Sequence, residues 1–315
     1  MLKPLKPADT EQSDPRFANL DQLGSGDLLR LMNEADAQVS AAVAVEIPKI
    51  ACAVDAIAAV LAKGGRLFYI GAGTSGRLGV LDASEIPPTF GVPADVVQGI
   101  IAGGPAALSR ATEASEDDHQ AGARDLLAAG FRAADAVIGI AASGSTPYVL
   151  GAIAKASEMG AVTCGICCNR GSALAGTVRY PMEPETGPEI VAGSTRLRAG
   201  TATKIILNMI STTVMIRLGH VYGNLMVNVQ PTNRKLEDRA IRIIERAAEV
   251  SRENAEELLR LSGRNVRTAI LMAKLGVERS EAGRLLAAHK GRIRDVLAQT
   301  RLAQTKNDIL PRESQ

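Results

Sequence analysis

The chain of 315 residues is 46% hydrophobic and 22% charged, which excludes a disordered protein and allows one large or two modest domains. A net charge of +2, 3% aromatic residues and the lack of Trp give no reason to expect a nucleic-acid partner or a membrane surface as partner. No apolar run reaches membrane-spanning length, and the first residues, MLKP, carry no secretory signal, so we expect a cytoplasmic protein.

The N-terminal region is predicted to be a short flexible arm followed by helices. Residues 1–20 contain Pro4, Pro7 and Pro15 before any periodic pattern begins. From residue 25 to residue 63 the apolar residues recur at helical spacing. We therefore expect the main domain to begin at residue 21.

Strand and helix patterns alternate through the next part of the chain. Strands are predicted at residues 66–70, 95–100, 136–140, 161–167 and 178–182, and helices at residues 76–83, 105–114, 119–129 and 147–159. This alternation indicates a parallel sheet with helices on both faces. Ligands of such sheets bind at the carboxyl ends of the strands.

The segment after the first strand has the composition of a phosphate-binding turn. It reads GAGTSGRLG over residues 71–79. Glycines such as Gly73 let backbone N–H groups approach an anion, and the hydroxyls of Thr74 and Ser75 add donors at the start of a helix. The spacing also fits a dinucleotide fingerprint, although no suitable acidic residue ends a second strand, and a turn that only packs a helix on a strand is a third possibility. The tandem hydroxyls favour a sugar phosphate.

Two carboxylates follow in unusual settings. Glu85 precedes Pro87 and Pro88, whose rings fix the backbone, and a rigidly held glutamate near a phosphate pocket is a plausible acid/base group. Glu116 stands among other acidic residues, and crowding of like charges can raise a carboxyl pKa toward a catalytic range. The alternative is that residues 116–118 form an acidic cap on the next helix.

Further polar segments follow two later strands. The segment AASGSTPY at residues 141–148 is again a small, hydroxyl-rich turn that opens a helix, and it offers Ser143, Ser145 and Thr146. The segment at residues 193–204 adds four more candidates for binding an anion: Ser194, Thr195, Arg196 and Lys204.

Three of the four cysteines fall in the predicted strand at residues 161–167 or directly after it. Cys164 and Cys167 have the spacing of a metal or redox pair, but there is no second ligand pair and the three histidines are scattered. We therefore expect Cys164, Cys167 and Cys168 to be buried, reduced thiols, and we expect no metal site.

The C-terminal part is predicted to be a small all-helical module. An apolar helix at residues 204–218 precedes a change in composition near residue 232. Residues 233–304 then contain a charged amphipathic stretch at 233–261 and two short helices. Residues 305–315 are expected to be a frayed tail.

The motifs together resemble the N-acetylmuramic acid 6-phosphate etherase family over roughly residues 20 to 300. The matching blocks are YIGAGTSGRLGVLDASE at 69–85, PPTFG at 87–91, GIIAGG at 99–104, EDD at 116–118, AASG at 141–144, TPY at 146–148, GPE at 187–189, GSTR at 193–196, AGTA at 199–202, LNM at 207–209, MIRLG at 215–219 and VYGNLM at 221–226.

The resemblance implies a fold and a reaction. The fold is an α/β sugar isomerase (SIS) domain at residues 21–232, a three-layer αβα arrangement with a mainly parallel five-stranded sheet, usually paired as a homodimer. The family reaction removes the D-lactyl ether of N-acetylmuramic acid 6-phosphate by elimination and then hydration, giving N-acetylglucosamine 6-phosphate and D-lactate during recycling of cell-wall sugars. Glu85 would protonate the departing lactyl oxygen and Glu116 would be the other acid/base residue, with no metal or organic cofactor.

Three positions depart from the family's usual residues. Ile86, Pro105 and Ser145 stand where Cys, a charged residue and Arg are common, and Ser145 is the one expected to affect binding. A ketose–aldose isomerase is the main alternative, although neither phosphate turn contains the His that such enzymes typically use. A sugar-phosphate regulator is another, although residues 1–60 show no basic DNA-recognition helix.

Overall fold

The structure is a computed structural model that describes residues 9–110 and 116–309. Residues 1–8 of the expected arm, 111–114 of the expected helix and 310–315 of the expected tail lie outside the described residues. The chain divides into two compact units, one comprising Met1–Glu85 and Pro93–Val214 and the other Ile86–Val92 and Met215–Gln315. This division differs from the predicted boundary between residues 232 and 233.

The first unit contains a five-stranded parallel sheet, as predicted. The strands are β1 (Leu67–Gly71), β2 (Val97–Ile101), β3 (Ala136–Ile140), β4 (Val162–Ile166) and β5 (Tyr180–Met182), in the spatial order β2-β1-β3-β4-β5. The side chains of β1 and β3 are entirely buried, as expected of strands covered on both faces.

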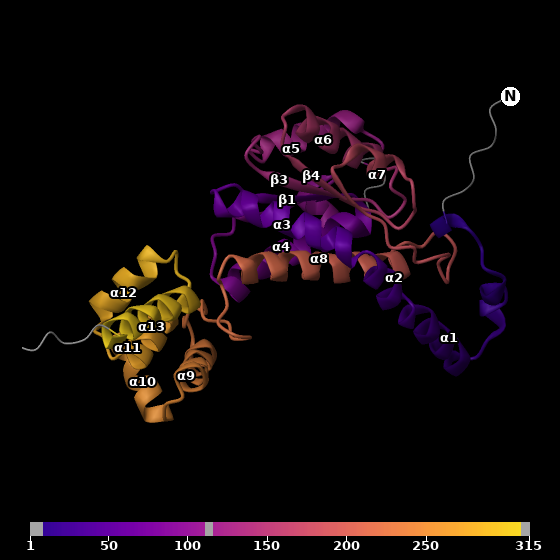
Figure 1. Cartoon of the computed structure of the whole chain (residues 1–315). Helices are drawn as coiled ribbons and strands as arrows, with labels where there is room; N and C mark the ends of the chain where they lie inside the picture. The colour runs from indigo at the N-terminus through magenta and orange to yellow at the C-terminus, as the bar shows by residue number, and fades with distance from the viewer. Residues whose placement is uncertain (1–8, 111–115, 310–315) are drawn as a thin grey trace, which may run out of the picture. The chain divides into compact units, whose positions relative to one another are not determined.

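Helices cover both faces of this sheet and complete three layers (Figure 1). One layer contains α5 (His119–Ala128), α6 (Pro147–Glu158) and α7 (Ala173–Thr177). The other contains α3 (Ile47–Ala62), α4 (Gly73–Phe90) and α8 (Arg198–Arg217). Aromatic and branched side chains fill the space between β1, β3 and α6, among them Phe68, Val137, Tyr148 and Ile153, each no more than 1% exposed. The expected SIS architecture is therefore confirmed.

The described part of the expected arm is packed. Three 3₁₀ turns, η1 (Asp9–Glu11), η2 (Pro15–Phe17) and η3 (Leu20–Gln22), precede α1 (Ser25–Ala37) and α2 (Val39–Val45). Thr10 is fully buried and Phe17 is 8% exposed. Residues 9–22 are thus held in place by tertiary contacts, which the sequence does not predict because this segment has no periodic pattern of apolar residues.

Three helices depart from their predicted bounds. Helix α4 continues through Pro87 and Pro88 to Phe90, because each proline removes only one helical donor and Ile86 and Phe90 are buried beside them. Of the helix predicted at residues 105–114, residues 105–110 are described, and they form the 3₁₀ turn η4 (Gly104–Leu108) followed by a turn and a bend instead of an α-helix. The amphipathic stretch breaks at Glu249, which has a φ of 60°.

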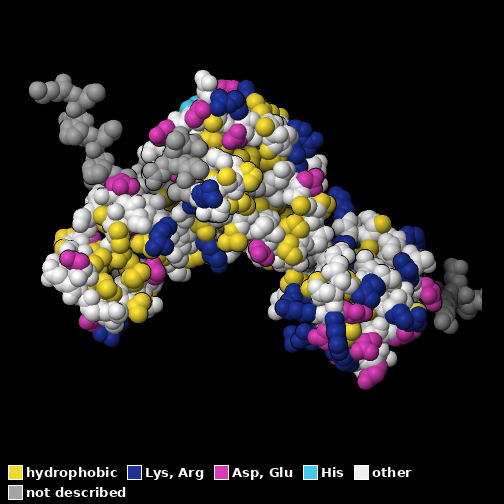
Figure 2. Space-filling model, turned by 180° about the vertical axis from the view of Figure 1, so that it is seen from behind, with side chains coloured by type: hydrophobic (Ala, Val, Ile, Leu, Met, Phe, Trp, Pro, Cys, Tyr) yellow, Lys and Arg dark blue, Asp and Glu magenta, His cyan; other side chains and the backbone are white. Residues whose placement is uncertain are grey.

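The second unit contains five helices in its described residues: α9 (Arg234–Ala248), α10 (Arg252–Leu261), α11 (Val266–Leu275), α12 (Arg279–Ala288) and α13 (Ile293–Ile309). Their apolar faces share one core that includes Ile244, Ala255 and Ile270. The charged side chains lie outside this core and are dense on the face shown in Figure 2. The all-helical composition matches the prediction, and α13 continues as a helix through residue 309 of the expected tail.

Helix α8 is the longest apolar helix in the described residues. Its 20 residues are long and apolar enough to cross a membrane by length and composition, which corrects the expectation that no such run exists. However, 56% of its apolar window is buried inside the protein, as in a core helix. Met209 and Ile216 remain 38% and 48% exposed.

Candidate functional site

The strand order places a switch point between β1 and β3. The chain passes from β1 to β2 on one side, and the later strands β3, β4 and β5 follow on the other. Gly71 at the end of β1 pairs with Ile140 at the end of β3, so the turns at residues 71–79 and 141–148 leave the sheet at the same level. Ligands of open α/β sheets bind in the crevice at such a point.

The first turn forms the start of α4, and Glu116 lies against it. Gly73 is the first helical residue and has a φ of 51°, a conformation that favours glycine. A Cβ atom at Gly73 would lie 3.1 Å from Oε1 of Glu116. The carboxylate of Glu116 therefore lies directly beside the first amides of α4, which have no partners within the helix. The hydroxyls of Thr74 and Ser75 are half-buried in the same turn.

The second turn is tied to the same acidic segment. The backbone N–H of Tyr148 donates to the carbonyl oxygen of Glu116 at 3.0 Å. Within the turn, Oγ of Ser143 accepts the N–H of Ser145 at 3.2 Å and lies 3.0 Å from its Oγ. Thr146 caps α6 without a side-chain hydrogen bond. The structure therefore brings both predicted phosphate turns and Glu116 together.

Within the acidic cluster at residues 116–118, the structure identifies the residue that caps the next helix. Asp118 caps α5, because its Oδ1 accepts the N–H groups of Gln120 and Ala121 at 2.9 Å each. These hydrogen bonds and that from Arg124 lower the pKa of Asp118. Glu116 is not the cap, and its carboxylate faces Gly73 instead.

The third polar segment, at residues 193–204, lies close to the first turn where α8 begins. A Cβ atom at Gly200 would lie 3.4 Å from the carbonyl oxygen of Thr195 and 3.7 Å from the methyl group of Thr74. Ser194 and Thr195 are half-buried, whereas Arg196 is exposed. Thr195 is therefore close to the site, and the side chain of Arg196 faces solvent.

The amides at the start of α8 are already occupied by a residue that sequence reasoning did not assign a role. Glu189 is 1% exposed and its two oxygens accept the N–H groups of Arg198 and Ala199 at 2.9 Å each. Burial raises the pKa of Glu189. A carboxylate therefore fills the start of α8, and the first turn at the start of α4 is the other helix N-terminus at this edge of the sheet.

Glu85 lies away from the two turns. It is 12 residues beyond Gly73 on the same helix, which corresponds to about 18 Å along the axis at 1.5 Å per residue. Its exposed side chain lines a cavity of about 210 Å³ together with Lys204 and Asn208. The two predicted catalytic carboxylates are therefore not adjacent within one chain, and Lys204 lies with Glu85.

A buried polar network lies beneath Glu85. Asp82, one helical turn earlier, is 6% exposed and accepts hydrogen bonds from Tyr69 Oη at 2.9 Å, Asn208 Nδ2 at 2.7 Å and Ser211 Oγ at 3.2 Å. Burial and the neighbouring carboxylate raise the pKa of Tyr69 well above its usual value. The network fixes α4 to α8 and thereby the position of Glu85.

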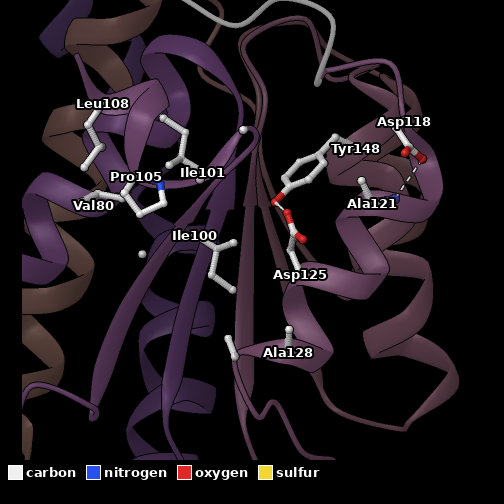
Figure 3. A pocket seen from close by; sticks show the side chains of 14 residues that line it. Val80, Ile100, Ile101, Pro105, Leu108, Asp118, Ala121, Asp125, Ala128 and Tyr148 are labelled. Carbon is white, nitrogen blue, oxygen red and sulfur yellow. Dashed lines mark hydrogen bonds between the residues drawn. The ribbon is translucent and has the colours of Figure 1, made fainter. Parts of the chain in front are cut away.

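A larger cavity of about 790 Å³ lies beside the site between β2, η4 and α5 (Figure 3). Its lining is mostly apolar and includes Ile100, Pro105 and Leu108. At one wall Tyr148 Oη donates to Asp125 Oδ2 at 2.7 Å, and burial raises the pKa of this tyrosine. The two phosphate turns do not line this cavity, apart from Tyr148.

The cysteines behave as predicted. Cys164, Cys167 and Cys168 are buried and free, and burial raises the pKa of each thiol, that of Cys167 to about 11. Cys52 is exposed on α3. In residues 9–110 and 116–309, no three His, Cys, Asp or Glu side chains cluster in a way that would hold a metal ion.

Comparison with known proteins finds relatives that match this chain over almost its full length. Residues 49–157 match the family profile of the glucokinase regulatory protein N-terminal SIS domain. The chain is 51% identical to the N-acetylmuramic acid 6-phosphate etherase of Cronobacter sakazakii, over 91% of this chain and 97% of the relative. It is 49% identical to the enzyme of the same name from Salmonella typhimurium, over the same shares of both chains.

Solved structures support the fold. A phosphoheptose isomerase from Francisella tularensis superimposes with a TM-score of 0.50 at 20% identity, covering 62% of this chain and all of that one. At this level of identity the likeness concerns the fold alone.

Proposed function

Because the chain belongs to the N-acetylmuramic acid 6-phosphate etherase family, we infer that it removes the lactyl group from N-acetylmuramic acid 6-phosphate. The products are N-acetylglucosamine 6-phosphate and D-lactate, released in the recycling of cell-wall sugars. The observation that carries this proposal is the carboxylate of Glu116 beside the glycine-rich start of α4, at the switch point of the sheet.

The 6-phosphate is proposed to bind at the two hydroxyl-rich turns. The first turn offers the amides of α4 with Thr74 and Ser75, and the second offers Ser143, Ser145 and Thr146. A helix N-terminus with unpaired amides favours a phosphate group. Ser194 and Thr195 border the same region, so they are the nearest candidates for the sugar hydroxyls. Arg196, which is exposed, has no comparable support from the geometry.

Glu116 is proposed to move the proton at C2. In the open-chain sugar this proton is acidic because it lies next to the C1 aldehyde. Glu116 takes the proton, the C2–C3 double bond forms, and the C3–O bond to lactate breaks. The lactyl oxygen receives a proton from the second carboxylic acid. Water then adds its hydroxyl group to C3 and a proton returns to C2, so that one water molecule is consumed in each turnover.

The second carboxylic acid is proposed to be Glu85 of the partner subunit in a homodimer. Within one chain about 18 Å of helix separates Glu85 from Gly73, which is too far for both carboxylates to reach one sugar ring. Glu85 is exposed beside Lys204, and Leu81, Met209 and Ile216 leave apolar surface on the same two helices. A second copy that packs on this surface would carry its own Glu85 to the neighbouring site. We also propose that this homodimer is cytoplasmic.

The test is an assay for release of D-lactate from N-acetylmuramic acid 6-phosphate by the purified full chain. The wild-type protein should produce D-lactate and N-acetylglucosamine 6-phosphate in equal amounts. Glu116→Gln should lower turnover by about 10²- to 10⁴-fold, the usual loss on removing an acid/base group, while its melting temperature stays close to that of the wild type. Interconversion of aldose and ketose phosphates without D-lactate would instead favour the isomerase alternative.

A further inference from the structure

The turn η1, at the start of the described chain, is hydrogen-bonded to Asn169, 159 positions later in the sequence, and to Gly193 in the third polar segment. The side chains of Thr10 and Asn169 are buried, at 0% and 7% exposed. Their separation of 159 positions makes this a long-range side-chain contact. A buried polar pair of this kind is retained only when its hydrogen bonds are made.

The side-chain amide of Asn169 links Thr10 to the second turn. Its Nδ2 donates to Oγ1 of Thr10 at 3.1 Å and to the carbonyl oxygen of Ala142 at 2.9 Å. Its Oδ1 accepts the backbone N–H of Thr10 at 3.3 Å. Ala142 directly precedes Ser143, so Asn169 holds the start of the second phosphate turn.

The backbone of Thr10 links the same pair to the third polar segment. Its carbonyl oxygen accepts the N–H of Gly193 at 3.2 Å. A Cβ atom at Gly193 would lie 2.9 Å from Oε2 of Glu11, and Gly193 has a φ of 77°, so η1 sits closely against this loop. Gly193 directly precedes Ser194 and Thr195.

We propose that Thr10 and Asn169 are positioning residues of the sugar-phosphate site, through which η1 supports two of its segments. The path from Ala142 through Asn169 and Thr10 to Gly193 consists entirely of hydrogen bonds, and it holds the second turn and the third segment at a fixed separation. Neither side chain needs to touch the substrate. This inference rests on the proposed function, because it assigns the two segments to one ligand.

The test compares Thr10→Val with Thr163→Val. The first variant keeps the shape of the side chain and loses the hydroxyl that binds Asn169. The second is a matched control: Thr163 is 3% exposed on β4, and its Oγ1 accepts the N–H of Arg179. Thr10→Val should raise KM for the muramyl sugar phosphate by about three- to tenfold, the effect expected for one neutral hydrogen bond, and should leave kcat within about twofold. Thr163→Val should leave KM unchanged, and Thr10→Ser should restore the wild-type KM.

Two further measurements keep the outcome decisive. Asn169→Ala should raise KM as well, and the double variant should be no worse than Asn169→Ala alone, because both changes break the same link. Calorimetry with N-acetylglucosamine 6-phosphate measures binding without turnover and should show the same loss of affinity. Wild-type binding with no D-lactate release would defeat the proposed reaction and leave the binding comparison intact. Equal KM values for Thr10→Val and wild type, with only a lower melting temperature, would overturn the positioning role.

Discussion

Complementation between two inactive variants tests whether Glu85 acts across a dimer. Glu85 and the turn that holds Glu116 are separated by about 18 Å of helix within one chain, so a site assembled across a dimer takes one carboxylate from each subunit. Glu85→Gln and Glu116→Gln should each lose about 10²- to 10⁴-fold in turnover. A mixed dimer of the two variants then contains one site with both carboxylates intact and one with neither.

The expected magnitude follows from counting sites. If the two chains are co-expressed in equal amounts and pair at random, half the dimers are mixed and half the sites in those are intact, so activity should return to about a quarter of wild type. Purification through two different tags would isolate the mixed dimer and raise this to about half. The assay is release of D-lactate per active chain.

The reverse pairing is the control. A mixed dimer of wild type with the double variant Glu85→Gln/Glu116→Gln should be nearly inactive, because each of its sites lacks one carboxylate. If Glu85 acted within its own chain, this dimer would keep half the activity and the first pairing would stay inactive. That reversal would refute the reasoning from helix length.

Three further predictions follow from single contacts. Gly73→Ala should destabilise the fold by about 1–2 kcal/mol, because a φ of 51° is costly for alanine, and should lower kcat because the new methyl group meets Glu116; thermal melting and steady-state kinetics measure both effects. Ser75→Ala should weaken substrate binding, and unphosphorylated N-acetylmuramic acid should be a poor substrate; equal turnover of both sugars would remove the phosphate site. Burial opposes ionisation of Asp135, but hydrogen bonds from Arg66 and Arg132 outweigh the effect of burial and lower the pKa of this carboxyl. The ionised carboxylate therefore stabilises the fold above about pH 4, and this stabilisation is lost as the pH falls through the pKa of Asp135 in the folded state. Asp135→Asn should therefore lower the melting temperature at pH 7 and have a smaller effect near pH 3.

The elements predicted from sequence are those whose pattern is local. All five strands were placed within about two residues, because each is a short apolar run bounded by glycine or polar residues. The glycine-rich turns were recognised for the same reason. Asp118 and Glu116 show where local reasoning stops. Both are acidic residues before a helix, and only the folded structure shows that Asp118 caps the helix and Glu116 faces Gly73.

Other features depend on contacts between distant parts of the chain. The hydrogen bonds of Thr10 with Asn169, and of Glu189 with the start of α8, have no periodic signal, although the block GPE at residues 187–189 marked Glu189 as part of the family resemblance. The end of α4 was also missed, because the pattern predicts that this helix ends before the two prolines. The helix continues through Pro87 and Pro88 because residues beside them are buried, and this tertiary effect acts against the low helix propensity of proline.

The distribution of the four thiols makes the native chain ready for site-specific chemistry. Cys52 is exposed on α3, whereas the other three are buried with raised pKa values, so a maleimide dye should attach at one position per subunit without any substitution. Two batches labelled with a donor and an acceptor fluorophore would then report exchange of chains in the proposed dimer in real time. Such a signal would show directly when the mixed pairs needed for complementation have formed.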